Sequence, residues 1–346
     1  MRFRLLGILV FAATMLLAVD ANAQLSPQWE SCTENQDLDA RIKACTAMIE
    51  SGQETPINLS VAYNNRGNAY SAKGDFDRAI ADFNDAIGLD PNLPTVYYNR
   101  GNAYDDKGEL DRAIADFNAA IRLDPKFAFA YNNRGSAYNA KGDFDRAIAD
   151  YSAAIRLDPK YAVAYNNRGN AYGAKGDFDR AIVDCSEAVR LDPKYALGYR
   201  TRGIAYLYKG DLAKALADVG QASKLDPKQP YSVLWLDILE KRDNVASSLP
   251  QATSHIDMTK WPAPIIRMFL GQATPAAVLA AANDPDATKK KGQVCEADFY
   301  GGEFSLRTGA KDEAVALFRL ASSNCPKYFD EWGAANHELK ALGSAP

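Results

Sequence analysis

Apolar and small residues recur in the middle of the chain every three or four positions, as they do on one face of an amphipathic helix. Between residues 76 and 89, for example, Ala79, Phe83 and Ala86 follow this spacing. A Gly-Asp step stands before the stretch and a Leu-Asp-Pro triplet closes it. Glycine favours the left-handed conformation that ends one helix, the acid caps the next, and proline cannot continue the backbone bonding. The pattern therefore predicts pairs of helices of about 13 residues each, joined by a tight turn.

This helical hairpin is repeated along the chain. Equivalent glycines stand 34 residues apart, at Gly67, Gly101, Gly135, Gly169 and Gly203. Five repeats cover residues 60–229, and each ends at a proline: Pro91, Pro125, Pro159, Pro193 and Pro227. A fixed period of this length is typical of solenoids, in which stacked hairpins bury a common core. The sequence thus predicts an all-α solenoid of antiparallel helix pairs.

The repeated positions resemble the tetratricopeptide repeat. With Ser60 as position 1, repeat 1 has aromatic residues at positions 4, 11 and 24, small residues at 8, 20 and 27, and proline at 32: Tyr63, Tyr70, Phe83, Gly67, Ala79, Ala86 and Pro91. The resemblance implies a right-handed superhelix. We interpret the tyrosines and phenylalanines as core packing rather than as a ring-stacking platform for a ligand.

Two charged positions are constant in the five repeats. Position 7 is arginine (Arg66, Arg100, Arg134, Arg168 and Arg202) and position 23 is aspartate (Asp82, Asp116, Asp150, Asp184 and Asp218). Both lie eight residues from the turn at position 15, so they are level in an antiparallel hairpin. We interpret them as five structural ion pairs that hold the two helices in register. If exposed, each pair contributes only about 0 to 1 kcal/mol.

In tetratricopeptide proteins, positions 2, 5, 6, 9, 12 and 13 of the first helix line the concave surface, called here the inner face. The resemblance places a run of asparagines there: Asn64, Asn65, Asn68, Asn99, Asn102, Asn132, Asn133, Asn166, Asn167 and Asn170. An amide offers donors and an acceptor to the backbone of an extended peptide, which predicts peptide binding. The alternative is that several of these side chains bond only to neighbouring repeats. The basic side chains with which chaperone-tail receptors of this family clamp a carboxylate are absent from positions 2 and 5 of repeats 1–4.

The segments beside the array have less regular patterns. Residues 24–59 form a degenerate helical cap in which Cys32 and Cys45 have the separation of positions 11 and 24, so a disulfide is the preferred interpretation and two buried thiols the alternative. Residues 230–292 are a helical connector, in which the lysine run 289–291 is interpreted as a solvated loop.

A sixth repeat with a capping helix occupies residues 293–346. In its predicted hairpin Cys295 and Cys325 are nearly level, so they are candidates for a second disulfide. Cys185 replaces the aromatic residue at position 24 of repeat 4 and is expected to be a buried free thiol.

Residues 1–23 have the layout of a cleavable secretory signal. Arg2 and Arg4 precede an apolar run of about 15 residues, fewer than the roughly 20 that span a bilayer. Ala21 and Ala23 supply the small residues of a cleavage site. We expect cleavage after Ala23, a periplasmic mature protein, and no lipid anchor because no cysteine ends the apolar run.

Charge and composition exclude several functions. The chain has 40 basic and 44 acidic residues and a net charge of −4, whereas proteins that bind nucleic acid need a surplus of cations. Only two histidines are present, and no G-x-S-x-G, H-E-x-x-H or phosphate-binding glycine loop occurs. We therefore predict a protein that is not an enzyme and needs neither metal nor cofactor.

The C-terminal third carries a second resemblance. The succession LWLDILEK, KWPAPIIRMFLGQAT and CEADFYGGEFSLRTGAKDEAVALFRLA is similar to the tail of the NlpI-type envelope proteins, which lack the extra repeats found here. It implies a dimeric periplasmic adaptor that brings cell-wall hydrolases and a processing protease together. The alternative is a structural component of an outer-membrane assembly or secretion complex.

Overall fold

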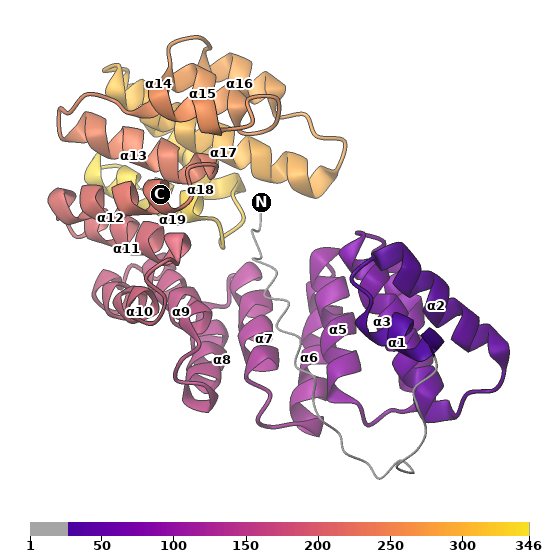
Figure 1. Cartoon of the computed structure of the whole chain (residues 1–346). Helices are drawn as coiled ribbons and strands as arrows, with labels where there is room; N and C mark the ends of the chain where they lie inside the picture. The colour runs from indigo at the N-terminus through magenta and orange to yellow at the C-terminus, as the bar shows by residue number, and fades with distance from the viewer. Residues whose placement is uncertain (1–26, 346) are drawn as a thin grey trace. The chain divides into compact units, whose positions relative to one another are not determined.

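A computed structural model describes residues 27–345 of the chain, and the expected signal segment lies outside these described residues (Figure 1). The described residues form nineteen α-helices, one short 3-10 helix and no strand. Helices next to each other in the sequence pack as antiparallel pairs, which confirms the all-α helical-hairpin architecture. The chain divides after Pro125 into two compact regions. They are called the N-terminal region and the C-terminal region below, and each is described by itself.

The N-terminal region contains a two-helix cap and repeats 1 and 2. Its helices are α1 (Pro27–Glu34), α2 (Leu38–Ser51), α3 (Pro56–Ala72), α4 (Phe76–Leu89), α5 (Pro94–Asp106) and α6 (Leu110–Leu123). A disulfide between Cys32 and Cys45 joins α1 to α2. Asp37 caps α2 because its carboxylate accepts hydrogen bonds from the backbone N–H groups of Asp39 and Ala40.

The turn and the close approach of the two helices both depend on glycine. Gly74 has φ of 80°, a conformation that costs glycine little, and Asp75 then accepts a hydrogen bond from the backbone N–H of Arg78 at the start of α4. Inside the hairpin, a Cβ atom at Gly67 would lie 2.7 Å from Cε1 of the buried Phe83 ring. The small residue at position 8 is therefore what lets the ring at position 24 fill the space between the helices.

The C-terminal region begins with repeats 3, 4 and 5, built by three hairpins of the same kind. Their helices are α7 (Ala128–Ala140), α8 (Phe144–Leu157), α9 (Ala162–Ala174), α10 (Phe178–Leu191), α11 (Ala196–Tyr208) and α12 (Leu212–Leu225). Cys185 on α10 is a buried free thiol, and burial raises its pKa far above the ordinary value. Such a thiol is chemically inert.

The rest of the C-terminal region is a compact helical body. It comprises α13 (Pro230–Arg242), α14 (Leu249–Ala252), the 3-10 helix Thr253–His255, α15 (Ala263–Phe269), α16 (Pro275–Ala281), α17 (Ala287–Arg307), α18 (Lys311–Asn324) and α19 (Asp330–Ala341). A core around Trp235, Phe299 and Phe318 fills it and is continuous with Val219 of repeat 5. A disulfide links Cys295 on α17 to Cys325 at the end of α18. The helical connector is thus packed on the repeats rather than extended from them.

The interpretation of the lysine run 289–291 as a loop is wrong. These residues lie in the first turns of α17, where Asp286 caps the helix by accepting from the N–H groups of Thr288 and Lys289. The three side chains are exposed.

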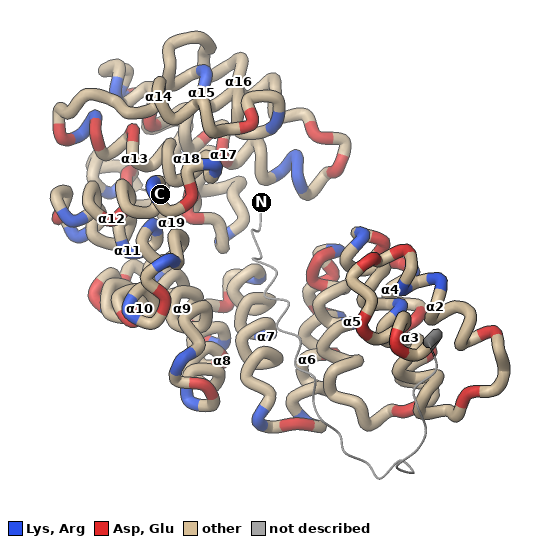
Figure 2. Tube along the Cα trace, viewed as in Figure 1, with Lys and Arg blue, Asp and Glu red and all other residues tan. Residues whose placement is uncertain are grey.

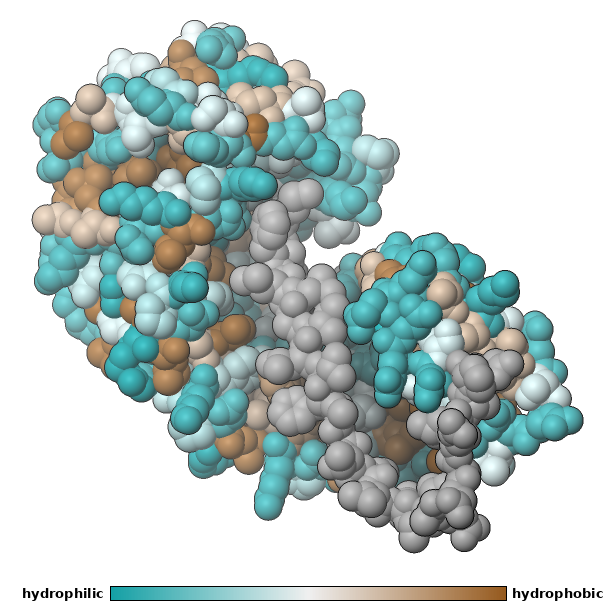
Figure 3. All heavy atoms as spheres, in the orientation of Figure 1, coloured by the Kyte–Doolittle hydropathy of each residue, from teal (hydrophilic) through white to brown (hydrophobic). Residues whose placement is uncertain are grey.

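Basic and acidic residues are interspersed in both regions (Figure 2), and hydrophilic and hydrophobic residues are interspersed on the visible face (Figure 3). Within residues 27–345, no helix combines the length and the apolar character needed to cross a bilayer.

Candidate protein-binding surface

The constant arginine and aspartate of each repeat meet across the hairpin. In repeat 1, Nε and Nη2 of Arg66 donate to the two carboxylate oxygens of Asp82, both at 2.8 Å. The other four pairs have the same two-pronged geometry, with distances of 2.6 to 2.8 Å. The aspartate side chains are only 6–10% exposed. These pairs are less exposed than a surface ion pair, and two parallel hydrogen bonds fix their geometry.

The arginine of the pair also reaches the preceding hairpin. Nη1 of Arg66 donates to Thr46 on α2, and Nη1 of Arg100 donates to Asn84 on α4. Arg168 and Arg202 make the same contact to a serine of the repeat before. Because the hydrogen-bonding groups of the pair are used within the fold, the pair has a structural role. Few of its donors and acceptors remain for a ligand.

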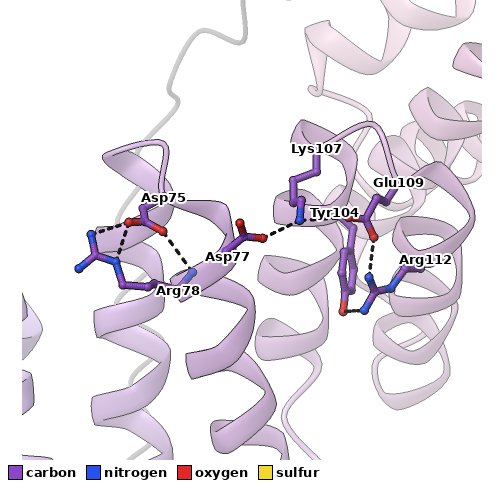
Figure 4. A network of polar contacts seen from close by, with 7 residues as sticks. All are labelled: Asp75, Asp77, Arg78, Tyr104, Lys107, Glu109 and Arg112. Carbon is purple, nitrogen blue, oxygen red and sulfur yellow. Dashed lines mark hydrogen bonds and ion pairs between the residues drawn. The ribbon is translucent and has the colours of Figure 1, made fainter. Parts of the chain in front are cut away.

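A second set of ion pairs, not predicted from the sequence, connects consecutive hairpins. The lysine at position 14 of one repeat pairs with the aspartate at position 18 of the repeat before, as Lys107 does with Asp77 at 2.6 Å (Figure 4). Lys175 with Asp145 and Lys209 with Asp179 form the same bridge. The signal was present in the sequence, because position 14 is lysine in all five repeats and position 18 is aspartate in repeats 1–4.

In the N-terminal region the asparagines of the inner face remain partly exposed. Asn64, Asn65 and Asn68 lie on α3, and Asn99 and Asn102 lie on α5. Nδ2 of Asn99 donates to Oδ1 of Asn64 at 3.0 Å, across the two repeats. This bond uses one donor of Asn99 and leaves both N–H donors of Asn64 and the carbonyl of Asn99 for another partner. The amides of α3 and α5 therefore form a polar surface with spare hydrogen-bonding capacity.

Two of the predicted binding residues are buried in the C-terminal region. Asn132 on α7 is 3% exposed and Asn166 on α9 is 2% exposed. Asn132 donates to Asn133 at 3.0 Å and accepts from Asn167 at 3.1 Å. The prediction that these asparagines present their amides to a peptide is wrong for Asn132 and Asn166. For Asn132 the alternative holds, because amide–amide bonds within and between repeats engage its side chain.

Helix α19 covers part of the same inner face. Nδ2 of Asn170 donates to Oδ1 of Asp330 at 2.9 Å, and Nη2 of Arg200 lies 3.5 Å from Oδ2 of the same carboxylate. The ring of His337 packs against Tyr208, with centroids 4.2 Å apart. The last helix was predicted to cover the open end of the stack; it packs on α17 and α18, and it also returns to the repeats at α9.

A hollow of about 350 Å³ lies at the turn tips of the first two hairpins and is lined by Lys73, Gly74, Asp75, Phe76, Asp77 and Lys107. The lysines and aspartates that line it are engaged with one another or with neighbouring charges, as Figure 4 shows for Asp75, Asp77 and Lys107. No group of three or more potential metal ligands occurs within residues 27–345.

Comparison with known proteins agrees with the hairpin geometry. The family profile described as "TPR repeat" matches residues 67–108, 101–142 and 135–176, and the one described as "Tetratricopeptide repeat" matches residues 162–195.

Several solved structures are similar over portions of the chain. YrrB, described as a TPR protein with an unusual peptide-binding site, is 25% identical over 56% of this chain and 97% of its own, with a TM-score of 0.45. The MamA protein is 30% identical over 50% of this chain and 94% of its own, with a TM-score of 0.44. A tetratricopeptide repeat protein from Parabacteroides merdae is 16% identical over 89% of this chain and 93% of its own, with a TM-score of 0.49. From the profile matches and the repeated helical hairpins together, we conclude that this chain carries tetratricopeptide repeats within residues 67–195 and that its described residues fold as all-α antiparallel helix pairs.

Proposed function

We propose that this protein is a non-enzymatic periplasmic adaptor that binds extended segments of other proteins along the amide surface of α3 and α5. Tetratricopeptide arrays are generally protein-interaction scaffolds, and the repeats support a protein-binding role. The observation that carries the proposal is the set of partly exposed amides on Asn64, Asn65, Asn68 and Asn99. The equivalent residues Asn132 and Asn166 are buried, so the proposed surface is limited to repeats 1 and 2.

The chemistry of this surface suits an extended backbone. A peptide in that conformation presents N–H and C=O groups that are not used internally, and an amide side chain can pair with either. Because these contacts involve the backbone of the bound peptide and not its side chains, the surface is expected to bind peptides of many sequences with modest affinity.

Two features support an exported location and the choice of partner. The pairs Cys32–Cys45 and Cys295–Cys325 are both disulfide-bonded, and disulfides persist mainly in oxidising compartments. The similarity of the C-terminal third to the NlpI-type proteins suggests cell-wall hydrolases and a processing protease as the bound proteins. We therefore propose both the exported location and these partners.

Site-specific photo-crosslinking in cells tests the binding surface. A photo-reactive amino acid replaces Asn65, and the adducts are identified by mass spectrometry. The triple variant Asn64→Ala, Asn68→Ala and Asn99→Ala should lose these adducts. The matched control is Asn92→Ala, which removes an exposed amide in the turn between α4 and α5 and should leave them unchanged. Adducts that survive the triple variant would exclude this surface.

A further inference from the structure

A hollow of about 270 Å³ lies in the helical body of the C-terminal region, and no residue of the repeats lines it. It is formed by residues 259–267 at the start of α15, residues 281–284 after α16, and the second turn of α17. These three helices pack against one another (Figure 1). Among the residues that line the hollow are Lys260, Trp261, Arg267, Asn283, Asp284 and Gln293. It is called the α15 hollow below.

The indole ring of Trp261 is held in a fixed position at the α15 hollow. Its Nε1 donates to Oε2 of the buried Glu296 at 2.5 Å, and the same carboxylate oxygen accepts from the hydroxyl of Tyr231 at 2.9 Å. The polar edge of the indole is therefore used within the core, while the side chain stays partly exposed and lines the hollow. An aromatic surface that is fixed before binding loses little conformational entropy when a ligand arrives.

Arg267 supplies an unpaired positive charge to the same hollow. Its side chain is exposed, and Nη2 donates to the backbone carbonyl of Met258 at 2.7 Å. In the part of the chain that the structure describes, Arg267 forms no ion pair. The other cation of the hollow, Lys260, has a surface partner in Asp257 at 3.3 Å. The guanidinium of Arg267 thus keeps N–H donors for an anion, and such a group binds a carboxylate through two parallel hydrogen bonds.

The amides and the acid at the other side of the hollow are ordered by the fold. Gln293 accepts from the backbone N–H of Asp284 at 3.2 Å, and Oδ1 of Asp284 accepts from the N–H of Asp286 at 3.0 Å. Oδ1 of Asn283 accepts from Nζ of Lys290, at 3.3 Å. This last bond leaves both N–H donors of Asn283 for a hydroxyl or carbonyl oxygen of a ligand. Lys290 belongs to the exposed lysine run 289–291, which adds positive charge beside the hollow.

We propose that the α15 hollow binds a sugar ring that carries a carboxylate. The faces of a sugar ring present C–H groups, which pack on the electron-rich face of an aromatic ring such as that of Trp261. The carboxylate of the sugar pairs with Arg267, and a hydroxyl or carbonyl oxygen accepts from Asn283. The volume of about 270 Å³ is close to the lower end, about 300 Å³, of pockets that hold small molecules. The hollow therefore accommodates one ring rather than several.

Two other anionic ligands fit the hollow less well. A phosphate monoester carries nearly two negative charges at neutral pH, whereas Arg267 is a single unpaired cation. A membrane surface would need Trp261 on a protruding tip with its N–H at the water interface, but here the N–H points into the core and the ring lines a hollow. The proposal also concerns a different surface from the amides of α3 and α5, so either can fail without the other.

Fluorine NMR of the whole protein labelled with 5-fluorotryptophan tests the proposal. The chain has four tryptophans, and the variant Trp261→Phe assigns the resonance of Trp261. N-acetylmuramic acid and N-acetylglucosamine are matched probes, because they differ only by the lactyl group that bears the carboxylate. Glucuronic acid represents the acidic polysaccharides, and lactate is an anion without a ring. The matched control for Arg267→Gln is Arg319→Gln, which removes an exposed arginine from α18 of the same helical body.

The expected result is that a sugar acid shifts the Trp261 resonance and that N-acetylglucosamine binds more weakly than N-acetylmuramic acid. Arg267→Gln should weaken the binding of the sugar acid by about tenfold or more, because it removes hydrogen bonds to a charged group. Arg319→Gln should leave the binding unchanged. The tighter of the two sugar acids then identifies the source of the ring, which is wall glycan for N-acetylmuramic acid and acidic polysaccharide for glucuronic acid.

Four results would overturn the proposal. Equal binding of N-acetylmuramic acid and N-acetylglucosamine would show that the carboxylate is not recognised, and equally tight binding of lactate would show that the ring is not. The absence of any Trp261 shift with both sugar acids would exclude the hollow as their site. A Trp261 shift caused only by vesicles of phosphatidylcholine and phosphatidylglycerol in equal amounts would assign the surface to a membrane instead.

Discussion

The close contact between positions 8 and 24 of each hairpin makes a quantitative prediction in repeat 1. A Cβ atom at Gly67 would lie 2.7, 3.0 and 3.1 Å from three atoms of the Phe83 ring, whereas carbon atoms in good contact are about 3.5 to 4.0 Å apart. Phe83 is fully buried, so the ring must move by several tenths of an ångström within a packed core. Overpacking of this kind costs about 1 to 3 kcal/mol.

Gly88 on α4 provides the matched control. It is an exposed helical glycine, and a Cβ atom added there would have no neighbouring atom within 4 Å. Gly88→Ala should stabilise the protein, because alanine is favoured over glycine in a helix by up to about 1 kcal/mol. Gly67→Ala gains the same helix propensity but incurs the overpacking cost, so its expected net effect is a loss of about 1 kcal/mol. The two variants should therefore differ by the overpacking cost alone, about 1 to 3 kcal/mol.

Urea unfolding followed by circular dichroism measures the midpoints, and hydrogen exchange of α3 and α4 locates the effect in the first hairpin. The double variant Gly67→Ala and Phe83→Leu should recover some of the loss, because the smaller side chain leaves room for the methyl group. If Gly67→Ala were as stable as Gly88→Ala, or if Phe83→Leu gave no recovery, the steric explanation of position 8 would be refuted.

Three further predictions concern charge, cross-linking and pH. Asp82→Ala should cost about 2 kcal/mol in urea unfolding, because it leaves a partly buried guanidinium unpaired, whereas Asp77→Ala on the surface should cost less than about 1 kcal/mol; equal costs would contradict the structural role of the first pair. Replacing Cys295 and Cys325 by serine should cost about 4 kcal/mol on the chain-entropy relation for their separation of 30 residues, and a thermal midpoint that does not change would contradict this. Burial, reinforced by the neighbouring charge of Glu296, raises the pKa of Glu331 to about 8. Between about pH 4.5 and pH 8 the folded state therefore binds a proton that the unfolded state has released. The free energy of unfolding should fall from pH 5 to pH 8 as a result. Glu331→Gln should flatten that slope, and a slope that persists would assign it to other groups.

The repeat itself could be predicted from the sequence because its determinants are local and occur five times. Gly74 and Asp75 form the turn, Gly67 accommodates Phe83, and Arg66 is level with Asp82 by the count of residues from the turn alone. The lysine–aspartate bridges between hairpins are equally periodic, but predicting them requires a comparison of two positions in different repeats. The lysine run 289–291 was wrongly interpreted because its helix begins after Asp286, outside any repeat that could indicate its start.

The sequence by itself determined the helical hairpins, their number in the regular array and the residue types on the inner face. Only the tertiary structure decided which asparagines stay exposed and which are buried, because Asn64 and Asn166 occupy the same position in nearly identical repeats. Part of the inner face is also covered by a distant segment: Asp330 reaches Asn170 across 160 residues, and α19 follows no period from which its position could be derived. Local periodicity specifies an element and its nearest neighbours, whereas the packing of a non-repeated helix depends on the free energy of the whole C-terminal core.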